Sequence, residues 1–161
     1  MKQASMLCGL LLGLAGTWAT AAETHLRREA LPPAVNAAFA SRYPGATILA
    51  ITRETTWGVT LFEAEMNVAG RRVDVVFDRL GTLREEEESL SFAQLPESVR
   101  ATHARSAQAK WTIERVELVT SAGPWKRYHY ELLAFDGKQR LALAYGTDGR
   151  RMSLRKTDAE D

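Results

Sequence analysis

The pattern of hydrophobic and polar positions occurs twice along this chain of 161 residues. Each copy begins with Leu-Pro-x-x-Val, at Leu31 and again at Leu95, and continues through alternating apolar segments separated by glycine turns. Leu95 follows Leu31 by 64 residues and Trp125 follows Trp57 by 68, so the spacing between the copies drifts only slightly. Internal repetition of this kind indicates an architecture built from two similar units.

The first copy predicts one helix followed by strands. Leu31, Val35 and Phe39 recur at helical spacing, the prolines before Ala34 suit a first helical turn, and Tyr43-Pro44-Gly45 ends the pattern. Period-two alternation then predicts strands at 46–54, 60–68 and 73–77, with a short fourth strand through Leu83. The run of four glutamates at 85–88 is interpreted as a solvated charge run.

The second copy repeats this order without the Tyr-Pro-Gly stop. A helix is predicted from Leu95 to about Arg105, and Asp136-Gly137 is a strong hairpin signal. Strands are predicted at 111–120, 125–135, 139–145 and 150–154. Residues 155–161 carry mixed charge without an apolar period, which predicts a frayed tail.

The predicted fold is therefore α+β. It consists of two tandem repeats, at residues 30–90 and 94–154, each a helix packed on a three- to four-stranded antiparallel meander sheet. On the strands, Glu63, Glu65 and Asp74 alternate with apolar residues and are expected on a solvent-facing side.

Residues 1–21 have the composition of a signal peptide. A positive start at Lys2, an apolar stretch and the small-x-small segment Ala19-Thr20-Ala21 predict cleavage after Ala21, with Ala22 as the other candidate. The apolar stretch is shorter than the roughly 20 residues of a membrane-spanning helix, so no stable membrane anchor is expected. The predicted location is the periplasm, with secretion as the alternative.

The amino-acid composition excludes some kinds of chemistry and some classes of partner. Cys8 is the only cysteine and would leave with the signal peptide, which excludes disulfides and thiolate chemistry in the mature chain. Loss of Lys2 leaves 20 basic residues against 20 acidic ones. A chain with no excess charge and no basic patch is not expected to bind nucleic acid.

The sequence contains no recognisable catalytic or metal-binding motif. His25, His103 and His129 do not stand at metal-ligand spacing, and the acidic stretch 78–88 lacks the alternating oxygen ligands of a calcium loop. The glycines are explained as turns between strands. We therefore predict a protein that is not an enzyme and has no cofactor and no metal site.

The combination of Leu-Pro-x-x-Val, an Ile/Val strand, an aromatic-Glu pair and a closing Asp-x-x-Gly or Asp-Gly resembles the PepSY-like, beta-lactamase-inhibitor-like (BLIP-like) domains of exported bacterial proteins. The resemblance covers about residues 30–154. It implies a helix on one face of an antiparallel meander, used twice. The namesake inhibitor binds its enzyme through an exposed concave sheet surface, but the cysteines that staple that inhibitor are absent here.

These observations predict a binding module that docks a protein or peptide of the cell envelope through its sheet surface and hairpin tips, and that could inhibit its partner. Large rings at hairpin tips suit interfaces, although they could instead cap the core. The alternative function is a small-molecule or metal-ion sensing accessory protein of an envelope signalling system, using the acidic sheet face with His129. The expected partner-binding residues are Trp57, Trp125, Tyr128, His129, Glu63 and Glu131.

Overall fold

The computed structural model describes residues 24–56, 58–122 and 127–157. In these ranges the chain forms a nine-stranded antiparallel sheet in which every strand pairs with its neighbours in sequence. The strands are β1 (Thr24–His25), β2 (Thr47–Thr56), β3 (Val59–Val68), β4 (Arg71–Asp78), β5 (Leu83–Ser89), β6 (Thr112–Ser121), β7 (Arg127–Phe135), β8 (Arg140–Gly146) and β9 (Arg151–Thr157). The helices are α1 (Pro33–Arg42) and α2 (Glu97–Ala104), with short 3-10 turns at Arg28–Ala30 and Phe92–Gln94.

The prediction of two separate helix-plus-sheet repeats is wrong. Strand β5 pairs with β6, from Glu85 opposite Ser121 to Ser89 opposite Glu117, so the strands of both halves form one continuous sheet. The physical reason is that an unpaired edge strand leaves a row of backbone donors and acceptors without partners, and pairing two edges removes both rows. The glutamates interpreted as a solvated run are part of β5.

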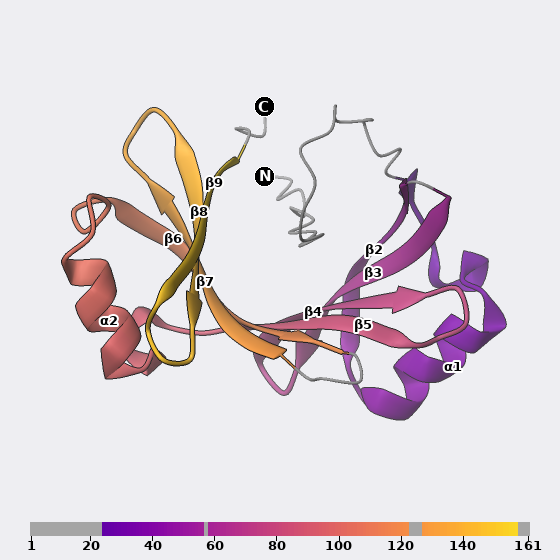
Figure 1. Ribbon diagram of the computed structural model, residues 1–161. Helices are drawn as coiled ribbons and strands as arrows, with labels where there is room; N and C mark the ends of the chain where they lie inside the picture. Colours follow the sequence, from indigo (N-terminus) through magenta and orange to yellow (C-terminus); the bar gives the residue numbers. More distant parts are fainter. Residues whose placement is uncertain (1–23, 57, 123–126, 158–161) are drawn as a thin grey trace.

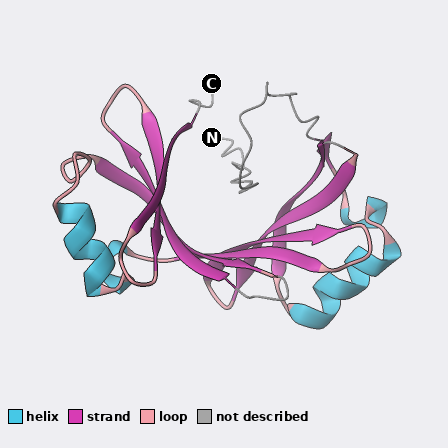
Figure 2. Cartoon of the chain, viewed as in Figure 1, coloured by secondary structure: helices cyan, strands magenta, loops and turns pink. Residues whose placement is uncertain are grey.

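The sheet curves into an arch, and both helices lie on its convex face (Figure 1). Figure 2 shows the same arrangement by type of element, with one helix beneath each arm of the arch. Strand β9 extends through Thr157, three residues beyond the predicted end of the fourth strand at Leu154. None of the described helices is long and apolar enough to cross a membrane.

Each helix buries its apolar side against its own half of the convex face. In the first half, Val35 and Phe39 of α1 join the side chains of β3 and β4, and the rings of Phe39 and Phe77 meet edge to face at 4.7 Å. In the second half, Val99 of α2 packs on apolar residues of β6, β7 and β8. These two clusters hold the helices on one face and leave the charged residues on the other.

Two glycines bring a turn into direct contact with the start of each helix. Gly81 has φ +77°, and a Cβ added there would lie 2.5 Å from the carbonyl oxygen of Ala34 in α1. Gly149 has φ +82°, and its added Cβ would lie 2.6 Å from the backbone of Ser98 in α2. Only glycine satisfies both the left-handed backbone and the close approach.

We expect Gly81→Ala and Gly149→Ala to destabilise the protein more than Gly137→Ala does. Gly137 also has a positive φ, +96°, but nothing lies within 4 Å of its added Cβ. All three substitutions incur about 1–2 kcal/mol for an L residue in the left-handed region. The two helix-contacting positions add an overpacking cost of about 1–3 kcal/mol. Urea unfolding measures the difference, and equal losses in all three variants would show that the turns do not support the helices.

Candidate functional site on the concave sheet face

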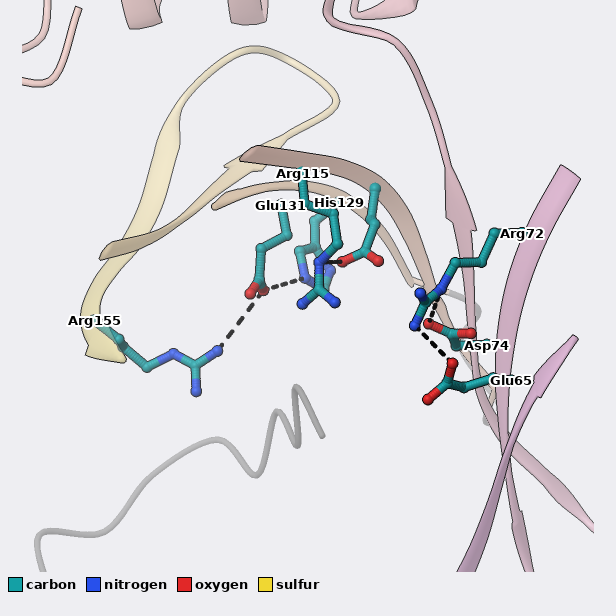
Figure 3. A network of polar contacts seen from close by, with 8 residues as sticks. Glu65, Arg72, Asp74, Arg115, His129, Glu131 and Arg155 are labelled. Carbon is teal, nitrogen blue, oxygen red and sulfur yellow. Dashed lines mark hydrogen bonds and ion pairs between the residues drawn. The ribbon is translucent and has the colours of Figure 1, made fainter. Parts of the chain in front are cut away.

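Charged side chains from several strands converge on the concave side of the sheet, and Figure 3 labels seven of them. They occupy the strand positions that alternate with the convex-face core, since a strand directs successive side chains to opposite faces. The group comprises Glu65 on β3, Arg72 and Asp74 on β4, Glu87 on β5, Arg115 and Glu117 on β6, His129 and Glu131 on β7, and Arg155 on β9.

The strand register brings carboxylates side by side. Glu65 lies opposite Asp74, and Asp74 lies opposite Glu87, so three acids form a row across β3, β4 and β5. Glu117 lies opposite Glu131 on the next pair of strands. Like charges directly opposite each other destabilise a sheet, and these acids are all less than 9% exposed. The fold must therefore compensate this charge.

Three arginines supply part of that compensation. Arg72 reaches both Glu65, at 3.0 Å, and Asp74, at 3.3 Å. Arg115 Nε lies 3.2 Å from Glu117 Oε2, and Arg155 Nη2 lies 3.7 Å from Glu131 Oε2.

The arginines lie nearer to solvent than the acids they contact. The side chains of Arg72 and Arg155 are 31% and 38% exposed, whereas those of Asp74 and Glu131 are both 6% exposed. The concave face thus has buried carboxylates at its floor and guanidinium groups above them. A partner approaching from solvent would reach the guanidinium groups first.

The most concentrated group of acids is Asp74, Glu87 and Glu117. One carboxylate oxygen from each lies within 4.8 Å of the others, and all three residues are buried. Glu85 lies two residues before Glu87 on the same strand, so the two side chains point to the same face.

Burial dominates the titration of these groups. Burial, with the repulsion of Glu117 and Glu85, raises the pKa of Glu87 to about 10. Burial raises the pKa of Glu117 to about 7, against the opposing charge of Arg115. Burial also raises the pKa of Asp74, although Arg72 opposes it. Glu87 is therefore the group that holds a proton at neutral pH.

The residues predicted from sequence are distributed over both faces. His129 and Glu131 lie together on the concave face, with His129 Nε2 4.0 Å from Glu131 Oε2, and burial lowers the pKa of His129. Glu63 is buried in the first half, where Thr52 Oγ1 lies 3.5 Å from its Oε2. All three side chains are buried. The expectation that Glu63, Glu65 and Asp74 lie on a solvent-facing side is therefore wrong, since each of these acids is less than 9% exposed.

Tyr128 lies next to His129 on β7, so its side chain points to the other face, and it is 46% exposed. Trp57 and Trp125 lie outside the described residues.

Sequence reasoning missed Arg72, Arg115, Arg155, Glu87 and Glu117. Alternation along β6 could have placed Arg115 and Glu117 opposite the apolar Val116. The proximity of Glu117 to Glu87 could not have been found in this way, because it depends on the pairing of β5 with β6. Only that pairing joins acids from the two halves into one cluster.

The fold defined here is that of the BLIP-like proteins. No model of a protein family matches the sequence, and no curated protein matches it. Among solved structures, a BLIP-like protein from Bacteroides fragilis matches with a TM-score of 0.63 and 21% identity over 81% of this chain and 89% of that one.

Two further structures show the same likeness. A candidate periplasmic protein from Bacteroides eggerthii matches with a TM-score of 0.66 and 15% identity, over 78% of this chain and 88% of its own. A DUF2874 family protein from Bacteroides ovatus matches with a TM-score of 0.65 and 19% identity, over 78% of this chain and 87% of its own. The expected BLIP-like fold is confirmed, and at these identities the likeness extends to the fold alone.

The proton on Glu87 predicts an unusual pH dependence of stability. An unfolded glutamate titrates near 4.5, whereas folding raises the pKa of Glu87 to about 10. Between these values the folded protein holds a proton that the unfolded chain releases, so the free energy of unfolding falls as the pH rises. We expect a loss on the order of 1 kcal/mol per pH unit between pH 7.5 and 9, measured by urea unfolding in EDTA.

Glu87→Gln should abolish most of this slope and unfold at higher urea concentration than the wild type at pH 9. The buried histidines do not obscure the result, since burial lowers the pKa of both His103 and His129 and they titrate below this window. Glu88→Gln is the matched control, because Glu88 is adjacent, lies on the other face and pairs with Arg71. A wild-type slope in Glu87→Gln would mean that another group carries the proton.

Proposed function

We propose that this chain is an exported, non-enzymatic module of the periplasm that docks an envelope protein or peptide on its concave sheet face. The observation that carries the proposal is the division of the sheet into two faces. Both helices pack on the convex face, and the opposite face presents charged side chains from several strands (Figures 1 and 3). The likeness to a BLIP-like protein supports a binding role, and the likeness to a candidate periplasmic protein supports the location.

The exposed groups of this face favour an acidic partner. Arg72 and Arg155 are the more exposed members of their ion pairs, and Arg115 is 21% exposed above a Glu117 side chain that is 3% exposed. Guanidinium groups bind carboxylates in a bidentate geometry, and arginine is enriched at protein interfaces. A peptide segment with aspartate or glutamate side chains, or a free C-terminal carboxylate, complements this layer.

The hairpin tips would border the docked segment. Tyr128 is the second residue of β7 and points to the face opposite His129, so its exposed ring would contact the partner only where the partner extends past the tip onto that face. Trp57 and Trp125 belong to the corresponding tips in the sequence. In this proposal the arginines select the charge of the partner and the rings contribute contact area.

Arg155→Gln should weaken capture of a partner from periplasmic extract about tenfold or more, since a lost charged hydrogen bond at an interface costs about 1.5–3 kcal/mol. The matched control is Arg150→Gln, in the turn before the same strand, whose side chain is 89% exposed and lies 3.8 Å from Asp148. Pull-down with quantitative mass spectrometry identifies proteins that depend on Arg155 and not on Arg150. Equal capture by both variants would remove the concave face as the docking surface.

A double substitution of Trp57 and Trp125 by Ala tests the hairpin tips separately. We expect capture of the same partner to weaken while circular dichroism and the unfolding midpoint stay close to wild type, because interface rings contribute to binding and not to the core. A large drop in the unfolding midpoint would instead assign the rings to capping the core. Unchanged capture with an unchanged fold would remove the tips from the interface.

A further inference from the structure

We propose that Asp74, Glu87 and Glu117 form a binding site for one divalent cation, and that Ca²⁺ is the cation it fits best. The site lies at the floor of the concave face and uses acids from β4, β5 and β6. It therefore spans the junction between the two halves of the sheet. The cation site can be tested without a docked partner, so it can fail or hold independently of the proposed function.

The three buried carboxylates suit one hard divalent cation. One oxygen from each lies within 4.8 Å of the others, so the three are close enough to share one ion. Calcium is bound by carboxylates in flexible geometry, whereas magnesium demands a near-ideal octahedron and keeps several of its waters. A cluster made of three protein carboxylates therefore favours calcium over magnesium.

Two buried oxygens in this cluster accept no hydrogen bond. Asp74 Oδ1 and Glu117 Oε1 have no hydrogen-bond partner in the described part of the chain, although the two side chains are only 6% and 3% exposed. Leaving a buried charged oxygen without a partner is costly, typically more than about 1–3 kcal/mol. A cation at the centre of the three acids would satisfy both oxygens at once.

The neighbouring positive groups leave these positions available. Arg72 contacts the other oxygen of Asp74, and Arg115 contacts the other oxygen of Glu117. In Asp74 and Glu117, one oxygen thus contacts an arginine, and the second has no hydrogen-bond partner in the described part of the chain.

The donor set excludes a preference for soft metals. The cluster consists of carboxylates, without a histidine nitrogen or a thiolate among its three members. Carboxylate oxygens suit calcium, magnesium and manganese, whereas zinc and copper favour imidazole and thiolate. Waters on the open side of the sheet can complete the six to eight ligands that calcium takes.

The test is a calcium titration of the purified wild-type protein after removal of metals with EDTA. At pH 7.5 we expect one Ca²⁺ per chain by isothermal titration calorimetry, a rise of several degrees in the unfolding midpoint at saturation, and a weaker response to Mg²⁺. Titration of the wild type without any heat or midpoint shift up to about 10 mM Ca²⁺, roughly tenfold above the dissociation constants of the weakest protein calcium sites, would overturn the proposal.

Substitutions locate the site. Glu117→Gln and Asp74→Asn should each weaken calcium binding at least tenfold, while Glu29→Gln, at an exposed acid in the 3-10 turn before α1, should bind as the wild type does. Wild-type affinity in both cluster variants would place the ion elsewhere and overturn the proposal. If a variant does not fold, the stoichiometry and the midpoint shift of the wild type, compared between Ca²⁺ and Mg²⁺, decide the question.

Discussion

The backbone pairing of β5 with β6 is the interaction on which the rest of this structure depends. It joins two halves that each have their own helix and apolar cluster. Without it, each half would expose an edge strand with unpaired backbone groups, a known route to aggregation. The same pairing places acids of β4 and β5 beside those of β6. The pairing of β5 with β6 therefore determines both the continuous sheet and the position of the candidate site.

The second consequence of a continuous sheet is that its two faces carry different side chains. The helices bury the apolar side chains on the convex face, and curvature then crowds the charged side chains on the concave one. Because strand alternation offers no other position for them, Glu65, Asp74 and Glu117 are buried without a hydrophobic layer above them. Arginines and at least one proton compensate the charge that remains.

Local signals predicted the local structure well. The prolines and the helical period located α1 and α2, and the glycine turns separated most of the strands within a few residues of their bounds. The prediction failed at β5, where four consecutive glutamates were interpreted as a solvated charge run and not as part of a strand. In the sheet these residues alternate: Glu85 and Glu87 face the concave side, whereas Glu86 bonds to Tyr43 and Glu88 pairs with Arg71.

Only those residues of the candidate site that belong to a local sequence motif could be predicted. The aromatic-Glu pattern indicated Glu63 and Glu131, and the difference between the copies indicated His129. Glu87 and Glu117 are 30 positions apart, and nothing in the pattern around either residue specifies the register that joins them. Pairing between distant strands depends on the whole sheet, so a correct list of elements still did not give the cluster.

Arg72 and Arg115 connect the cation site with the docking surface. Each guanidinium contacts an acid of the carboxylate cluster and is also among the more exposed groups of the concave face. A divalent cation at the cluster would add positive charge beneath them and would weaken their hold on Asp74 and Glu117. Both effects leave the arginines better able to bind carboxylates from solvent. Because linkage is reciprocal, an acidic partner would then also strengthen binding of the cation. Occupancy of the cation site would in this way set the affinity of the concave face for an acidic partner.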